Sequence, residues 1–189
     1  MITKPSVHDK TIFVYENALS ASICSRLISA FDASDNTFSG ITAGGLSEVK
    51  KNSELYIDPQ DAGWSALDEV IYSTYSHHVT DYFSHFPWLK IGFRDVGYFI
   101  KKYDKLSGYY DEHVDVSVRK NSPRILVGII YLNDVDDGGE TEFTTQGLRI
   151  QPKAGRMLLF PPMWMYPHKA NIPKSNHKYT VNTFFVLND

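Results

Sequence analysis

The hydrophobic pattern changes character near residue 89. Before that point, apolar residues recur at the i, i+3 and i+4 spacing of one buried helix face. After it, short segments rich in β-branched and aromatic residues alternate with turn signals such as DDGG at residues 136–139. The pattern predicts helices first and a β-rich core after them.

Two helices are predicted in the first half. The first follows Ser20, and Leu19 is placed to pack back onto its first turn. The second begins near Asp61 and ends before Pro87. The apolar face of the first helix comprises Ile23, Leu27, Ile28 and Phe31. The stripe of the second comprises Trp64, Leu67, Val70, Ile71, Tyr75, Val79, Tyr82 and Phe83.

The segment between these helices, residues 39–54 (SGITAGGLSEVKKNSE), is polar, charged and glycine-containing. It is either a plain connecting loop or a mobile flap, and connections of this length often carry function.

The second half predicts many short strands, which is typical of a sandwich or barrel; a jelly roll is one solution. No repeat or linker interrupts the chain. We therefore expect an α+β fold and a single domain over residues 1–189, with helical support at about 18–88 and a jelly-roll core at about 89–188. The predicted strands lie in residues 93–103, 109–118, 124–134, 139–145, 148–152, 155–162 and 178–188.

Composition narrows the function classes. Hydrophobic residues make up 42% and charged residues 22%, as in ordinary globular proteins. The net charge of −3 offers no field that would recruit nucleic acid or an anionic membrane. The chain shows neither the apolar run of a signal peptide nor the ~20 apolar residues of a membrane span, so we expect a cytoplasmic protein.

His113 and Asp115 are the first candidates for metal chemistry. Residues i and i+2 of a strand share one face, so this pair could chelate one divalent ion. A second histidine would complete the facial triad that suits Fe(II), and His168 follows several predicted strands later. Such a tripeptide also occurs by chance, and the alternative is a polar strand face.

Lys178 opens the last predicted strand, where alternation groups it with Thr180 and Asn182. If this face lines a cavity, the lysine points into apolar surroundings and needs an anion to meet it. The alternative is a strand-end lysine that reaches back to solvent.

Taken together, HVD at residues 113–115, YLND followed by GGET, the GR.LLF strand, His168 and Lys178 resemble the Fe(II)- and 2-oxoglutarate-dependent dioxygenases. The prolyl 4-hydroxylase-like branch is the most similar, over residues 94–185. This resemblance implies a double-stranded β-helix, or jelly roll, with supporting N-terminal helices.

The resemblance also implies roles. His113, Asp115 and His168 would hold the iron as the catalytic centre. Lys178 would pair with the distal carboxylate of 2-oxoglutarate as a point charge, and the Tyr131 hydroxyl would help to hold the same group. The resemblance places Tyr103 and Thr180 beside the cosubstrate and Arg124 either in the scaffold or at the substrate rim. We read GGET instead as a turn into a strand, with Thr141 and Phe143 packing in the core.

The activity implied is hydroxylation of an unactivated C–H bond with release of succinate and CO2. Peptidyl proline is the first expected substrate, with residues 39–54 as a flap over an extended peptide. The expected ligands are Fe(II), 2-oxoglutarate, O2 and, as a further cofactor, ascorbate. The alternatives are a small-molecule or other non-prolyl hydroxylase and a non-catalytic metal-binding jelly-roll module.

Overall fold

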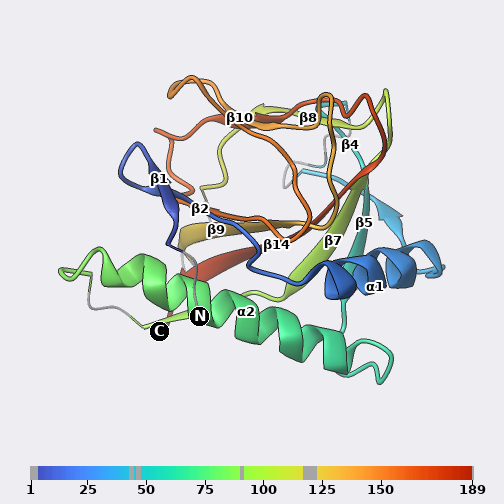
Figure 1. Cartoon of the computed structure of the whole chain (residues 1–189), viewed down its shortest axis with the longest axis horizontal. Helices are drawn as coiled ribbons and strands as arrows, with labels where there is room; N and C mark the ends of the chain where they lie inside the picture. Colours follow the sequence, from blue (N-terminus) through green and yellow to red (C-terminus); the bar gives the residue numbers. More distant parts are fainter. Residues whose placement is uncertain (1–3, 43–44, 46–47, 90–91, 117–122, 189) are drawn as a thin grey trace.

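The computed structural model describes residues 4–42, 45, 48–89, 92–116 and 123–188. Two antiparallel sheets face each other, and both helices lie along the outer side of the larger sheet, away from the smaller one (Figure 1). The expected jelly-roll core with supporting helices is confirmed. The larger sheet has the order β1-β2-β12-β9-β14-β7-β5-β3, with β6 paired to β14. The smaller sheet has the order β11-β10-β13-β8-β4.

The elements of the first half are β1 Ser6–His8, β2 Ile12–Tyr15, α1 Ala21–Asp32, β3 Phe38–Ser39, β4 Lys50–Lys51, β5 Ser53–Ile57 and α2 Ser65–Ser84. Those of the second half are β6 Phe93–Asp95, β7 Tyr98–Tyr103, β8 Tyr109–His113, β9 Arg124–Tyr131, β10 Thr141–Phe143, β11 Leu148–Ile150, β12 Met157–Phe160, β13 His168–Ala170 and β14 Lys178–Leu187.

Both helices form where the apolar periodicity predicts them. Ser20 caps α1, because its Oγ accepts a hydrogen bond from the Ile23 backbone N–H at 3.4 Å. The second helix begins four residues later than expected, at Ser65. The Asp61 carboxylate accepts from the Gly63 N–H at 2.7 Å and holds the preceding residues in a turn. Within the described residues, no helix is both long and apolar enough to cross a membrane.

The expectation of helices alone before residue 89 is wrong, because the first half also supplies strands to both sheets. Strand β2 pairs with β12, and its four residues are all buried, since its two faces contact different cores. Strand β1, which ends at His8, pairs with β2 in turn. Short runs such as these lack the length that a periodicity argument requires.

The segment 39–54 is likewise more ordered than a plain loop. Its described part contributes Ser39 to β3, all of β4 and the start of β5. Strand β4 pairs with β8, beside His113, and β5 pairs with β7. Residues 43–44 and 46–47 of this segment lie outside the described part. The segment therefore borders the region where the candidate metal ligands gather.

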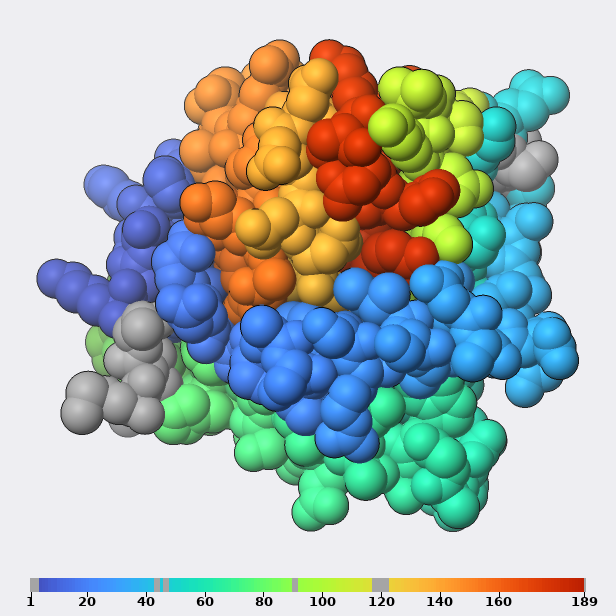
Figure 2. Space-filling model, turned by 45° about the vertical axis from the view of Figure 1, so that its right-hand side comes forward, coloured from blue at the N-terminus to red at the C-terminus, as the bar shows by residue number. Residues whose placement is uncertain are grey.

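Alternation along β14 separates the two faces of the larger sheet. Val181 and Tyr179 face the helices, and the Tyr179 hydroxyl donates to the Asp32 carboxylate at the end of α1 at 2.9 Å. Lys178 and Thr180 face the smaller sheet and line the cavity between the two sheets. Figure 2 shows α1 as a blue band between α2 below it and the strand ends above it.

Candidate functional site

Three potential metal ligands meet in the cavity between the sheets. His113 ends β8, His168 begins β13, and the two residues are direct cross-strand partners. Asp115 follows two residues after β8 ends. One ligand atom from each of the three side chains lies within 4.8 Å of the others. The structure thus brings together the three residues that the sequence singled out for iron.

The hydrogen bonds of the two imidazoles direct their free nitrogens at the same point. Nδ1 of His113 donates to the Asp111 carbonyl at 2.7 Å, and Nδ1 of His168 donates to the Tyr166 carbonyl at 3.1 Å. The Nε2 atoms lie 3.7 Å and 3.4 Å from the Asp115 carboxylate oxygens. Both histidines therefore take the tautomer whose Nε2 lone pair is available to a metal.

The charges of this cluster suit a divalent cation. Burial, with the neighbouring His168, lowers the pKa of His113 to about 4, so the ring is neutral at pH 7. Burial opposes ionisation of Asp115, but the close approach of His168 and the charge of Lys101 hold the pKa of the carboxyl well below its usual range. Two imidazoles and one carboxylate are the donor set of non-haem Fe(II) sites, so the residues fit that ion.

Neighbouring side chains fix these ligands. The Tyr110 ring stacks on His113 with ring centroids 3.5 Å apart and an interplanar angle of 17°. Arg124 donates from Nη1 to the Asp115 carbonyl at 3.0 Å and stacks on the Phe184 ring. Arg124 therefore supports the metal cluster from the scaffold side.

Lys178 points into the same cavity and not to solvent. Only 2% of the residue is exposed, and its Nζ donates to the Gly139 carbonyl at 2.7 Å. Burial lowers the pKa of Lys178 to about 7, against an opposing effect of Glu140. Among the described residues, no carboxylate lies within ion-pair distance of Nζ. An anionic ligand would supply the missing partner.

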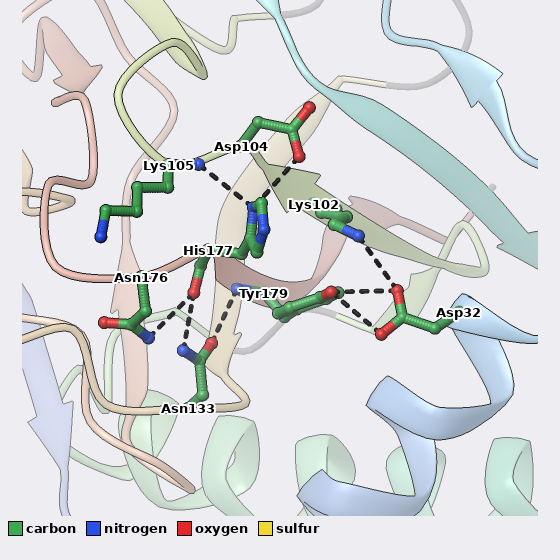
Figure 3. A network of polar contacts seen from close by, with 8 residues as sticks. All are labelled: Asp32, Lys102, Asp104, Lys105, Asn133, Asn176, His177 and Tyr179. Atoms are coloured by element: carbon green, nitrogen blue, oxygen red, sulfur yellow. Dashed lines mark hydrogen bonds and ion pairs between the residues drawn. The ribbon is translucent and has the colours of Figure 1, made fainter.

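A polar network fixes the backbone on both sides of Lys178 (Figure 3). Asn133 accepts from the Tyr179 N–H and donates to the His177 carbonyl, each at 2.8 Å. Asn176 donates to the same carbonyl at 3.1 Å. Asn133 belongs to the YLND motif, and its contacts show how that motif sets the position of the lysine.

The remaining predicted cosubstrate residues occupy different positions. Tyr103 and Thr180 line the cavity, and the Tyr103 ring lies 5.0 Å from Lys178 Nζ. Tyr131 is fully buried behind the cavity wall, and its hydroxyl donates to Thr141 Oγ1 at 2.7 Å. Thr141 itself lines the cavity. The interpretation of GGET as a turn with core packing did not identify Thr141 as a cavity residue. Alternation within β10 places Thr141 on the same face as the buried Phe143.

Two other histidines, His78 and His177, lie outside the metal cluster. His78 on α2 is buried against the Tyr15 ring, and burial lowers its pKa. His177 is exposed and lies in the middle of the Figure 3 network, where its Nδ1 accepts from the Lys105 N–H; it does not line the cavity. Neither joins the metal cluster.

Comparisons with known proteins agree with this geometry. Residues 98–186 match the family model of the 2OG-Fe(II) oxygenase superfamily, a range that contains all three clustered ligands and Lys178. A search of curated proteins found no match.

Several solved structures share the fold. A viral collagen prolyl hydroxylase of Paramecium bursaria Chlorella virus-1, solved with 2OG, has a TM-score of 0.71 at 19% identity, covering 94% of this chain and 97% of that chain. A Trichoplax adhaerens prolyl hydroxylase, in complex with a hypoxia inducible factor oxygen degradation domain peptide fragment, has a TM-score of 0.74 at 16% identity, covering 94% and 84%. A Pseudomonas putida prolyl-4-hydroxylase has a TM-score of 0.69 at 18% identity, covering 93% and 92%.

The family uses Fe(II) as its metal and 2-oxoglutarate as its cosubstrate, and the cavity contains side chains suited to each. Residues 98–186 therefore match a 2OG-Fe(II) oxygenase domain, the whole chain has the fold of the solved prolyl hydroxylases, and together these findings support a 2-oxoglutarate-dependent dioxygenase.

Proposed function

We propose that the protein hydroxylates an unactivated C–H bond of a peptidyl proline, with His113, Asp115 and His168 as the iron ligands. One observation carries the proposal: a 2-His-1-carboxylate cluster and a buried lysine without a carboxylate partner line one cavity. When bound, Fe(II) and 2-oxoglutarate activate O2, so that one oxygen atom enters the C–H bond and the other enters succinate as CO2 is released.

The residues of the chain bind 2-oxoglutarate and hold the metal ligands in place. The Lys178 ammonium pairs with the distal carboxylate of 2-oxoglutarate, and the Thr141 hydroxyl donates to the same group while it accepts from Tyr131. Phe143 and Phe160 pack against the His168 ring, with centroids 5.7 Å and 4.8 Å away, and keep water from that side of the metal ligands. These contacts preorganise the site before any substrate enters.

An aromatic rim supports a cyclic apolar side chain as substrate. Phe99 pairs across β7 and β14 with Asn182, which lines the cavity, and its ring lies 5.2 Å from that of Tyr56. Tyr56 is 43% exposed and Phe184 lines the cavity nearby. Aromatic faces of this kind pack well against a pyrrolidine ring. The viral and Trichoplax structures named above are prolyl hydroxylases, the latter with a bound peptide.

The first test is release of CO2 from carboxyl-labelled 2-oxoglutarate with added Fe(II), with and without ascorbate. We expect turnover in the native protein, its loss in His113→Ala, and its retention in His77→Ala, which removes an exposed histidine of α2 outside the cavity. Turnover that persists in His113→Ala would contradict the ligand assignment. Metal content of the same variants, measured after loading with Fe(II) or Mn(II), gives a readout that does not depend on activity.

The second test addresses the substrate. Proline-containing peptide arrays are read by mass spectrometry for a gain of one oxygen atom. Hydroxylated proline supports the proposal. Turnover of 2-oxoglutarate with no hydroxylated peptide would refute the proline assignment and favour a small-molecule substrate.

A further inference from the structure

A second lysine lines the active-site cavity and has no role in the reaction described above. Lys101 in β7 pairs across the sheet with Thr180, so both side chains lie on the face that contains Lys178. Its neighbour Lys102 points to the opposite face, where it contacts the Asp32 carboxylate at 3.2 Å (Figure 3). The two adjacent lysines therefore serve different sides of the sheet.

Lys101 belongs to a buried cluster of charges. Lys50 from β4 and Lys101 approach the same oxygen, Glu54 Oε1, at 2.5 Å and 3.4 Å. The amide of Asn52 donates to this oxygen as well, at 3.0 Å. The side chains of Lys50, Lys101 and Glu54 are 5%, 12% and 9% exposed. Three donors thus share one oxygen, and Lys101 is the most distant of them.

The cluster carries more positive than negative charge. Burial opposes the ionisation of Glu54, but Lys101 and Lys50 lower the pKa of the carboxyl below its ordinary value. The shorter ion pair, with Lys50, neutralises this carboxylate. Among the described residues, Glu54 is the only ion-pair partner of Lys101, so the Lys101 ammonium lacks a carboxylate of its own. A buried ammonium in this state is costly unless an anion completes its surroundings.

The cosubstrate does not supply that anion. The two charges of 2-oxoglutarate and the one of Asp115 are offset by Fe(II) and Lys178, so the positive charge at Lys101 stays unbalanced. Along β7, Lys101 stands between Tyr103, beside Lys178, and Phe99, at the aromatic rim. This position lies between the cosubstrate end of the cavity and its rim, where the substrate must enter.

We propose that Lys101 binds a carboxylate of the substrate, carried close to the C–H bond that is hydroxylated. The inference rests on the proposed hydroxylase function and adds a substrate class to it. Two sources share this chemistry: an acidic side chain beside the target residue of a peptide, and the α-carboxylate of a C-terminal or free amino acid. Lys50 and Glu54 position the Lys101 side chain from the segment 39–54.

The test uses pairs of substrates that differ only in a carboxylate or its amide. The peptide pairs carry Glu or Gln beside proline, or end in a free or an amidated C-terminal proline. The small-molecule pairs are free amino acids and their amides, and they include amino acids other than proline. Substrate-stimulated CO2 release gives kcat/KM for each member. We expect at least a tenfold preference for the acid of the best pair, its loss in Lys101→Met, and its partial retention in Lys101→Arg. Lys102→Met, which removes the same charge from the outer face, retains the preference.

A binding measurement separates recognition from turnover. The best pair is titrated calorimetrically into protein loaded with Mn(II) and an unreactive 2-oxoglutarate analogue, N-oxalylglycine. Tighter binding of the acid in the native protein, lost in Lys101→Met, supports the proposal. Equal binding of acid and amide, a preference that persists in Lys101→Met, or failure of every acid in the panel overturns it. Failure of the hydroxylase function would instead appear as absent 2-oxoglutarate turnover or turnover independent of His113.

Discussion

The Tyr131 hydroxyl donates to Thr141 Oγ1 at 2.7 Å, and Thr141 separates it from the cavity. A threonine hydroxyl that accepts one hydrogen bond can still donate its own hydrogen. We propose that the Tyr131 hydroxyl acts on 2-oxoglutarate by a relay through Thr141, in place of the direct contact that the family resemblance implies.

The relay predicts a non-additive pair of substitutions. Thr141→Val removes a donor to a carboxylate and should raise the KM for 2-oxoglutarate about tenfold, the effect of ~1.4 kcal/mol. Tyr131→Phe should raise it less, and should add nothing in the Thr141→Val background. Steady-state kinetics of the four proteins test this. If Tyr131→Phe has its full effect in both backgrounds, the tyrosine contacts the cosubstrate independently of Thr141. The matched control is Tyr82→Phe, which removes a hydroxyl that donates to the Thr11 carbonyl.

Lys178 predicts a pH dependence of stability. In the unfolded chain a lysine keeps its proton to about pH 10.4, whereas in the folded, ligand-free protein burial lowers the pKa of Lys178 to about 7. Between these values the unfolded chain binds more protons, so this group makes the free energy of unfolding rise with pH, by at most ~1.4 kcal/mol per pH unit. Urea unfolding from pH 6 to 9 should reveal this contribution in the native protein and its absence in Lys178→Met.

The same titration acts in the opposite direction on ligand binding. Pairing with a carboxylate requires the ammonium form, so 2-oxoglutarate affinity should fall as pH rises above about 7. Calorimetric titration of the Mn(II)-loaded protein measures this, and binding should be accompanied by proton uptake at pH 8. A pH-independent affinity in this range would show that Lys178 keeps its proton without the ligand. Lys178→Met should bind at least tenfold more weakly at pH 7.

Asn133 is predicted to act through Lys178. Asn133→Ala removes the bonds to the Tyr179 N–H and the His177 carbonyl, freeing the backbone on both sides of the lysine. We expect a higher KM for 2-oxoglutarate, by about fivefold, with the KM for the organic substrate unchanged. Asn176→Ala removes the longer bond to the His177 carbonyl and the bonds to Asp134 and Ser175, but it leaves the bond to the Tyr179 N–H intact and should have a smaller effect. Equal changes in both KM values would instead indicate a general loss of structure.

Gly128 predicts a packing cost. A Cβ atom at this position of β9 would lie 2.5 Å from a ring carbon of Tyr75, which α2 places against the sheet. Gly128→Ala should lower the free energy of unfolding by ~1–3 kcal/mol in denaturant melts, because the ring has no room to move. Tyr75→Leu should relieve part of this cost, so the double variant should be more stable than the sum of the single effects. Additive effects would argue against the steric explanation.

Local patterns sufficed for much of the site and for the long elements. The i, i+2 spacing pointed to His113 and Asp115, which do approach each other although Asp115 lies beyond the end of β8, and strand alternation turned Lys178 inward. These inferences succeed because each depends on a few neighbouring residues. The pairing of His113 with His168 depends on how distant strands meet, so the sequence indicated His168 as a candidate by its place several strands later and by the family resemblance, but gave no register for the pair.

Other features had no local signal. Strand β2 is a four-residue run buried on both faces, and the three-residue β10 is too short for alternation to identify Thr141 as a cavity residue. The charge cluster around Lys101 joins β4, β5 and β7, so it exists only after three strands have paired.

Lys178 and the metal cluster belong to two sheets that differ in local stability. Lys178 lies in β14, a ten-residue strand paired with β6, β7 and β9, whereas His113 and His168 lie at the ends of strands of five and three residues. Short strands open locally at lower free energy than a long central one. Iron should therefore escape through brief openings of the smaller sheet that leave the cosubstrate wall intact, and the emptied protein can be reloaded without refolding.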